Sequence, residues 1–179
     1  MKKIILIALI FLVNISSAQK ELTTTAGIVN FEASVPLYED VSATNKTVSC
    51  MLNLKSGALS SEVQMKDFEF KLSLMKEHFN KKYLETDHFT NAYFKGTIEG
   101  FNWNIIDTNP KEFKLNGELK LHGKSKKINT IILLKKIENK LEVVSNFRIN
   151  VTDFNIEIPE ILSMKVAETV NVNSRFLLQ

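Results

Sequence analysis

The stretch LEVVSNFRINV, residues 141–151, sets the class of fold because apolar and polar side chains alternate along it. A β-strand places every second residue on one face, so Leu141, Val143, Phe147 and Ile149 would share the buried face. The same period recurs along the chain in rows whose apolar positions are Val29, Phe31, Ala33 and Val35; Val48, Cys50, Leu52 and Leu54; Leu59, Val63 and Met65; Ala92, Phe94, Gly96 and Ile98; Phe113, Leu115, Leu119 and Leu121; and Val170, Val172, Phe176 and Leu178. Residues 128–137 are apolar on both faces. The sequence therefore predicts about eight antiparallel strands.

One segment departs from this period. Between residues 70 and 84 the apolar side chains recur at three- and four-residue spacing, at Phe70, Leu74, Met75, Phe79 and Tyr83. Neither Gly nor Pro interrupts the segment, so the pattern predicts one amphipathic helix over residues 70–84. A second, shorter helix or turn is expected over residues 160–167, directly after Pro159.

The order of these elements favours an all-β fold, an eight-stranded antiparallel barrel with one amphipathic helix inserted between strands 3 and 4. Closure into a barrel removes the exposed edges that an open sheet would leave. An interior of eight strands is either filled by side chains or holds one small ligand. On periodicity alone, a β-sandwich is also possible.

Residues 1–18 have the three parts of a secretory signal peptide: Lys2 and Lys3, an apolar run over residues 4–13, and small residues before a predicted cut at Gln19. The run is too short to span a bilayer, which takes roughly 20 residues. No Cys follows the cut, as a lipid anchor would require. We therefore expect residues 19–179 to form one domain that is periplasmic or secreted, without stable insertion in a membrane.

Charge and cysteine content narrow the possible partners. The formal charge is +3, and removal of Lys2 and Lys3 lowers it to +1, which gives no electrostatic reason to expect nucleic acid as a partner. Cys50 is the single cysteine, so no internal disulfide is available. Its place in an alternating row predicts a small buried hydrophobe. Nothing in the sequence sets the oligomeric state.

The sequence carries few residues suited to catalysis. The three histidines, His78, His88 and His122, lack the spacing of a metal site, and residues 121–125 (LHGKS) lack the glycine spacing of a phosphate loop. We expect no metal, no cofactor and no enzymatic activity. An enzyme would need His78 or His122 beside an acid. Asn45-Lys46-Thr47 and Asn150-Val151-Thr152 match the N-glycosylation triplet, which matters only on a eukaryotic secretory route.

Phenylalanine dominates the aromatic residues. The chain has 12 Phe, 3 Tyr and 1 Trp, and only Phe11 falls within the predicted signal peptide. These rings either fill a core or line a tunnel in which a hydrocarbon chain takes the place of side chains. Burial is worth about 0.8 kcal/mol per CH₂, so a long chain could bind tightly without polar contacts. Composition does not separate the two cases.

Four segments, in order along the chain, carry the motifs of one known domain family. They are the helical segment at residues 68–87, a strand with a Phe before the outgoing turn at residues 92–98, and a Gly-x-Leu-x-x-His-Gly hairpin at residues 117–126 (GELKLHGKSK). Residues 154–159 with the strand at Val170 complete the series. Together these segments resemble the YceI-like family of polyisoprenoid-binding or lipid-binding domains. The resemblance implies a lipocalin-like barrel, often periplasmic, whose interior accommodates an isoprenoid or fatty-acyl chain.

On this basis we expect a soluble carrier or binder of a long apolar ligand, an isoprenoid or fatty-acyl lipid. The residues expected to line its site are Phe70, Leu74 and Phe79 from the helix and Phe31, Phe94, Phe113 and Phe147 from the strands. His78 is expected either to meet a polar head group at the mouth or to be a packed or capped histidine. The alternative is a structural or stress-related interaction module whose barrel is filled and takes no ligand.

Overall fold

The computed structural model describes residues 21–38, 40–162 and 164–179, and the predicted signal peptide lies outside them. The wall strands are β1 (Glu21–Ser34), β2 (Ser42–Asn53), β3 (Ala58–Gln64), β5 (Asn91–Ile98), β6 (Lys111–Leu121), β7 (Lys124–Ile137), β8 (Lys140–Asn150) and β9 (Val166–Leu178). The other elements are η2 (Met65–Asp67), β4 (Glu69–Phe70), α2 (Ser73–His78), η3 (Phe79–Tyr83), η4 (Trp103–Ile105), η5 (Val151–Phe154) and η6 (Glu160–Leu162).

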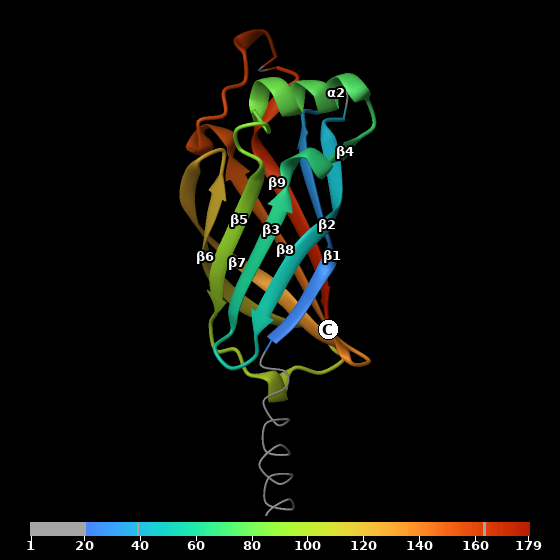
Figure 1. Ribbon diagram of the computed structural model, residues 1–179, viewed down its shortest axis with the longest axis vertical. Coiled ribbons are helices and arrows are strands. Elements are labelled where there is room, and N and C mark those ends of the chain that lie inside the picture. The colour runs from blue at the N-terminus through green and yellow to red at the C-terminus, as the bar shows by residue number, and fades with distance from the viewer. Residues whose placement is uncertain (1–20, 39, 163) are drawn as a thin grey trace, which may run out of the picture.

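The eight long strands form a closed antiparallel barrel (Figure 1). Each strand pairs with the next along the chain, and β1 pairs with both β2 and β9, which closes the ring. The two-residue strand β4 adds to β2 outside this ring. A turn at Ser56-Gly57 joins β2 to β3, with Gly57 at φ +69°, where a side chain would be strained. The predicted barrel is thus confirmed, and the sandwich alternative is set aside.

The helix between β3 and β5 is shorter than the sequence predicted. Phe70 belongs to β4 and pairs with Ala43, and α2 begins only at Ser73. After His78 the turns widen into the π-helix η3, where the N–H of Leu84 donates to the carbonyl of Phe79 at 2.9 Å. The ring of Phe70 still lies 5.0 Å from that of Phe79, so the regular spacing reflects a shared aromatic cluster and not one continuous helix.

The other boundaries also shift. Strand β1 starts at Glu21, well before the alternating row at Val29, and the helix or turn expected over residues 160–167 is the single turn η6 followed by the start of β9 at Val166. Within residues 21–38, 40–162 and 164–179, no helix is long and apolar enough to span a membrane.

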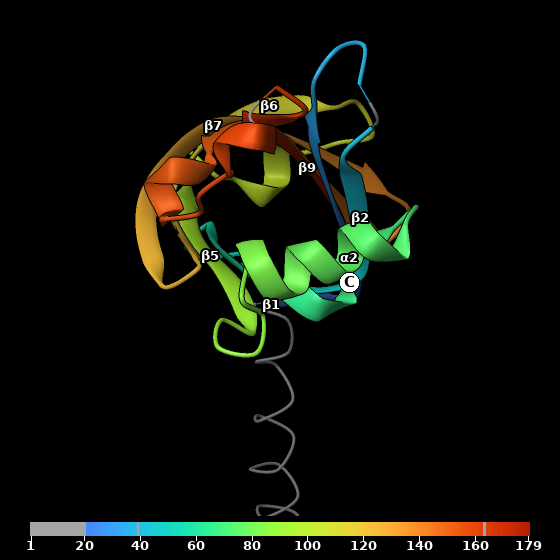
Figure 2. The same ribbon diagram turned by 90° about the horizontal axis from the view of Figure 1, so that it is seen from above.

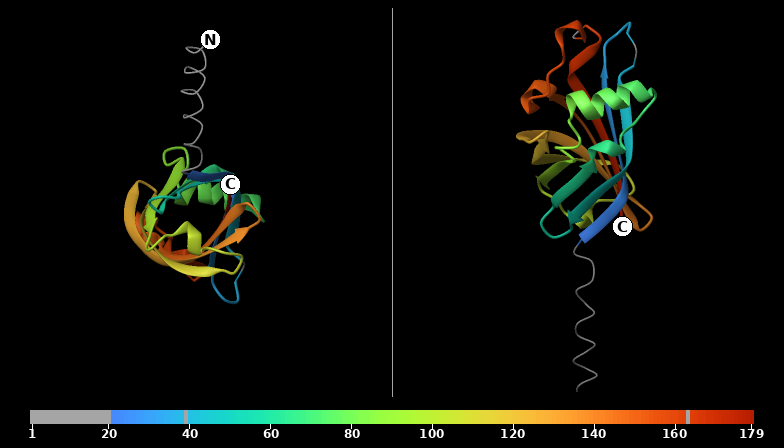
Figure 3. Two further views of the ribbon diagram at one scale, coloured as in Figure 1. Left: turned by 90° about the horizontal axis from the view of Figure 1, so that it is seen from below. Right: turned by 45° about the horizontal axis from the view of Figure 1, so that its top comes forward.

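The two ends of the barrel differ. At the lower end of Figure 1 lie the start of β1, the C-terminus and η4 (Figure 1 and Figure 3, left). The strand residues nearest this end point inward and are almost completely buried: Leu52, Ile98, Leu134, Leu141 and Leu178 are 0 to 2% exposed. Aliphatic side chains therefore fill the lower end as a conventional core.

The upper end is crossed by the segment between β3 and β5, residues 65–83, called the cover segment below. Seen from above, α2 lies across one side of the ring, while the β1–β2 connection and the β8–β9 connection rise beside it (Figure 2 and Figure 3, right). Helix α2 contributes no fully buried residue, whereas η3 buries Phe79. The cover segment therefore lies over one side of this end and contributes Phe79 as its buried residue.

Candidate functional site

Beneath the cover segment the barrel interior is hollow. The cavity has a volume of about 490 Å³ and is lined by inward-facing residues of the wall strands together with Met75, His78, Phe79 and Tyr83 of the cover segment. The residues that fill the lower end, such as Leu52 and Leu178, do not line it. The volume lies within the range of about 300–1,000 Å³ that is typical of small-molecule sites. The barrel is therefore packed at one end and hollow at the other.

A cluster of four phenylalanines forms the part of the cavity wall under α2. The ring of Phe79 stacks on Phe31 of β1 at a centroid distance of 5.5 Å, and it meets Phe68 at 5.6 Å and Phe70 at 5.0 Å. Phe31 in turn lies 5.3 Å from Phe68 in an edge-to-face arrangement. Such aromatic pairs contribute about 0.5–1.5 kcal/mol each beyond their burial, so the cluster fastens the cover segment to the barrel wall.

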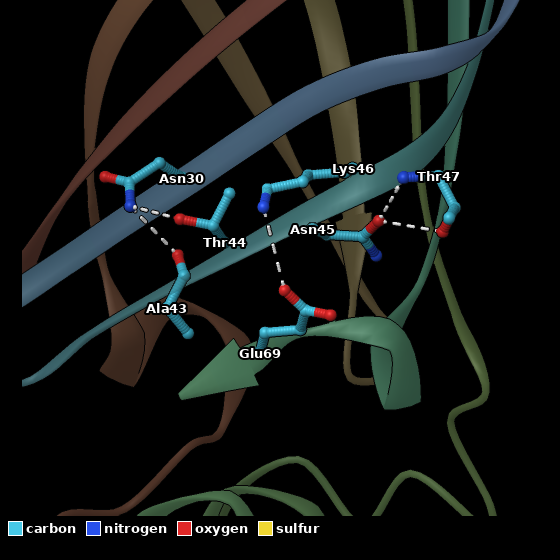
Figure 4. Close-up of polar contacts among 7 residues, drawn as sticks. All are labelled: Asn30, Ala43, Thr44, Asn45, Lys46, Thr47 and Glu69. Atoms are coloured by element: carbon cyan, nitrogen blue, oxygen red, sulfur yellow. Dashed lines mark hydrogen bonds and ion pairs between the residues drawn. The ribbon is translucent and has the colours of Figure 1, made fainter. Parts of the chain in front are cut away.

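Polar contacts anchor the other side of the cover segment to β2. Asn45 is fully buried, its amide donates to the carbonyl of Gln64 at 2.8 Å, and its Oδ1 accepts from the N–H and hydroxyl of Thr47 (Figure 4). The single O–H of Thr47 is shared between Asn45 Oδ1 at 3.0 Å and the carboxylate of Asp67 at 2.8 Å. These bonds satisfy the backbone where the β1–β2 register shifts, and they fix the end of β3, from which the cover segment departs.

Two further contacts lie beside this anchor (Figure 4). Lys46 faces Glu69 at 3.9 Å, and the amide of Asn30 donates to the carbonyl of Ala43 at 3.1 Å and to the hydroxyl of Thr44 at 3.0 Å. The Lys46–Glu69 pair is exposed and contributes little, about 0–1 kcal/mol. The buried Asn45 is therefore the main polar anchor.

In both glycosylation triplets the asparagine side chain is hydrogen-bonded within the protein. Asn45 is buried as described, and the Oδ1 of Asn150 accepts hydrogen bonds from the N–H and the hydroxyl of Thr152 at the start of η5. Each asparagine thus stabilises a local turn of the backbone.

Six of the eight residues predicted to bind ligand line the cavity. They are Phe31, Phe70, His78, Phe79, Phe94 and Phe147. Leu74 does not, because α2 begins at Ser73 and turns this side chain outward, where it is 59% exposed. Phe113 faces inward but is packed in the barrel core away from the cavity. Ligand contact by the six residues stays a prediction.

Sequence reasoning missed several lining groups. Phe68 completes the aromatic cluster, and the hydroxyls of Ser61, Ser145 and Ser174 face the cavity from β3, β8 and β9. The signal for Ser145 was present in the opening stretch, where it takes an inward position between Val143 and Phe147. Ser145 can be recognised from the sequence because a serine stands where the alternating row otherwise has apolar residues.

The ionisable groups nearest the cavity are held neutral or lie at its upper end. Burial raises the pKa of the Tyr83 phenol above its ordinary value. His78 lies in the last turn of α2, and Lys165 directly precedes β9. Away from the cavity, Cys50 is buried as predicted, and burial raises the pKa of its thiol to about 12. This thiol therefore stays protonated and unreactive at neutral pH.

A second, shallower hollow surrounds His122 at the turn between β6 and β7. Its Nδ1 lies 3.0 Å from the carbonyl of Phe154 and its Nε2 lies 3.2 Å from Glu85, while Phe89 packs edge-on against the imidazole at 4.4 Å. An acid is thus beside His122, as an enzyme would need. Both ring nitrogens are already engaged, however, which favours a structural role that ties three segments together.

Within the described part of the chain, no group of three or more His, Cys, Asp and Glu side chains gathers in a way that could hold a metal ion. Catalysis is not tested by this observation. The feature with the clearest capacity to bind something is the apolar cavity.

The chain thus forms an eight-stranded antiparallel barrel that is packed at one end and has an apolar cavity beneath a short helix at the other. The model of the YceI-like domain matches residues 15–177, so the chain belongs to the YceI-like family, as the sequence resemblance indicated. A search among curated proteins finds no match.

Three solved structures share the fold. A polyisoprenoid binding domain from Saccharophagus degradans, implicated in plant cell wall breakdown, is 14% identical with a TM-score of 0.77 over 89% of this chain and 98% of its own. BcnA of Burkholderia cenocepacia is 14% identical, with a TM-score of 0.71 over 86% and 96% of the two chains. The YCEI protein of Campylobacter jejuni is 15% identical, with a TM-score of 0.63 over 80% and 86%. At such identities the likeness establishes the fold.

Proposed function

We propose that this protein is an exported carrier or binder of a long apolar molecule, an isoprenoid or fatty-acyl lipid, which lies in the barrel cavity. The observation that carries the proposal is a cavity of about 490 Å³ in a barrel whose other end is closely packed. Protein interiors rarely contain voids larger than a water molecule, and unfilled apolar space costs stability. A hydrocarbon chain would fill this space and gain about 0.8 kcal/mol for each CH₂ that leaves water.

Two further lines support the proposal. One solved structure with this fold is described as a polyisoprenoid binding domain. The signal-peptide pattern of residues 1–18 supports export to the periplasm or the exterior, where an apolar molecule needs shielding from water. Because both nitrogens of His122 are engaged, we propose binding without catalysis as the activity.

The alternative of a filled barrel that acts only as an interaction module is less well supported. Such a barrel would be packed along its whole length, whereas only the lower end is packed here. The cover segment is also fastened by aromatic contacts that themselves line the cavity. A filled module would not need a wall of this kind.

The test compares a variant whose cavity is blocked with a control variant that carries the same substitution on the outer face. Ser61→Phe places a ring in the cavity from β3, and Ser60→Phe places the same ring on the outer face of the same strand. We expect native mass spectrometry to find a co-purified lipid on the wild type and on Ser60→Phe, and to find it reduced on Ser61→Phe. A fluorescent fatty acid should bind in the same order.

Three outcomes would contradict the proposal or its place in the barrel. One is a wild-type protein that is consistently empty and binds no lipid probe. Another is a Ser61→Phe variant that is folded, as judged by circular dichroism, and binds the probe as tightly as the wild type. Equal loss of binding in both variants would also count against a site in the barrel interior.

A further inference from the structure

Two hydroxyl groups meet inside the largely apolar cavity. Ser145 of β8 and Ser174 of β9 are cross-strand partners, both line the cavity, and their Oγ atoms lie 2.7 Å apart. Ser145 is only 7% exposed. Their other cross-strand partners are apolar: Ile132 faces Ser145, and Val29 faces Ser174. The pair is therefore a polar spot on a hydrocarbon-like wall.

One of the two hydroxyl groups in this pair has no acceptor for its hydrogen. Two serines carry two O–H groups, and the bond between them uses one. Within the described residues, neither hydroxyl has another hydrogen-bond partner. By contrast, the hydroxyl of Thr130, which also lines the cavity, donates to the carbonyl of Asn146 at 3.1 Å. One O–H of the serine pair therefore remains available to a group inside the cavity.

The opposite wall carries a further hydroxyl, that of Ser61. Strand β3 lies four places from β8 around the ring of eight, and Ser61 faces the cavity from it. Within the described residues its hydroxyl has no hydrogen-bond partner. A polar group in the cavity thus has hydroxyls on two facing walls.

The basic side chains that line the cavity lie away from the serine pair. Of the residues that line the cavity, His78 and Lys165 come from the helix-covered end. Ser174 is eight residues into β9 from Val166, which is about 26 Å of strand. A carboxylate or phosphate beside the serines would be desolvated without a counter-charge, which is costly. The site suits an uncharged oxygen.

We propose that the Ser145–Ser174 pair binds an uncharged hydrogen-bond acceptor at the buried end of the ligand. This inference rests on the proposed function and narrows it: the ligand is a long apolar chain that carries a carbonyl, ether or hydroxyl oxygen, and that oxygen enters the cavity first. The chain then extends toward the cover segment. A donated hydrogen bond removes the cost of an unsatisfied buried O–H, which would otherwise oppose burial.

The test compares two ligands of equal length in two proteins. Heptadecan-2-one carries one acceptor and heptadecane carries none, and each competes with a fluorescent fatty-acid probe for the purified wild type and for S145A/S174A. We expect the ratio of ketone affinity to alkane affinity to fall by about 3- to 10-fold in the variant, because one hydrogen bond is lost. The control Val29→Ala alters the neighbouring wall without removing a donor and should leave the ratio unchanged.

A spectroscopic measurement adds an independent readout. The carbonyl stretch of the bound ketone should lie at lower frequency in the wild type than in S145A/S174A, since a donated hydrogen bond weakens the C=O bond. An equal affinity ratio in the two proteins, or an unchanged carbonyl frequency, would overturn the inference while leaving lipid binding intact. If neither ligand nor the probe binds the wild type, the proposed function itself fails and the inference falls with it.

Discussion

The phenyl ring of Phe94 lies directly over the backbone of Gly117, so that a β-carbon on Gly117 would be 2.4 Å from Cζ of the ring. Gly117 pairs across the strands with Gly96, where a β-carbon would lie 2.9 Å from the same atom. The two glycines thus leave a shallow depression in the wall, which the ring fills. Phe94 is held flat against the wall, and the middle of the cavity stays open.

Gly117→Ala should therefore destabilise the protein. The added methyl group would meet both the ring of Phe94 and the carbonyl of Lys95, which lies 2.6 Å from the β-carbon position. We expect a loss of about 1–3 kcal/mol in the free energy of unfolding, measured with urea. Phe94→Leu combined with Gly117→Ala should recover part of that loss, because leucine lacks the outer ring atoms. Additive effects of the two substitutions would contradict this contact.

Asn45→Ala should remove the anchor of the cover segment. The substitution leaves the carbonyl of Gln64 and the N–H of Thr47 without this partner, and it removes a polar side chain that is itself fully buried. Such losses cost about 1–3 kcal/mol. Asn30→Ala is a suitable control, because Asn30 is only partly buried and its loss should cost less. Urea unfolding of both variants checks the prediction, and equal losses would contradict it.

Glu142 should make the protein sensitive to acid. Burial disfavours its charged form, but hydrogen bonds and charge from Lys135 and Arg175 outweigh this, so the pKa of Glu142 lies below its ordinary value of 4.5. A carboxyl with a lowered folded pKa contributes stability above the unfolded pKa and loses it as the pH falls through the folded pKa. We expect the unfolding free energy of the wild type to fall more steeply than that of Glu142→Gln as the pH drops below about 4.5.

The comparison with Glu142→Gln is needed because exposed acids also titrate in this range. Asp87 and Asp107 have lowered pKa values for the same reason, namely neighbouring hydrogen-bond donors and lysines. Their contributions are common to both proteins and cancel in the difference. Identical pH profiles for wild type and Glu142→Gln would show that Glu142 does not contribute.

His122→Ala should lower stability without changing ligand binding. The imidazole contacts the carbonyl of Phe154, the carboxylate of Glu85 and the ring of Phe89. We expect the midpoint of thermal unfolding to fall by several degrees, since about 1–3 kcal/mol is typical for loss of a buried polar group. His88→Ala, at an exposed position, should leave the midpoint almost unchanged. A lipid-probe affinity that falls only in His122→Ala would argue for a functional role instead.

Alternation predicted the wall of the barrel well because burial on one face is a local property. Residues 92–98 and 113–121 fall within β5 and β6 as expected. Residues 21–24, by contrast, show little alternation and are part of β1 because their backbone pairs with β2. Strand pairing across such a distance leaves no signal in local sequence.

The candidate site was predicted less completely for a related reason. Alternation tells which face a residue occupies but not its height along the barrel, so Phe113 was assigned to the site although it packs outside the cavity. The direction in which Leu74 points depends on where α2 begins. Phe70 pairs with Ala43 and lies 5.8 Å from Phe31, so it belongs to β4, and the helix starts only at Ser73. Tertiary contacts of this kind override the helical pattern.

The division of the barrel into a packed and a hollow end has a consequence for how its sequence can change over time. Core packing at the lower end involves residues such as Leu141 and Leu178, which take no part in the cavity. If the proposed function holds, substitutions in the cavity lining change which molecule binds, while the packing of the lower end is left intact. Solved barrels only 13 to 15% identical to this chain keep the same architecture.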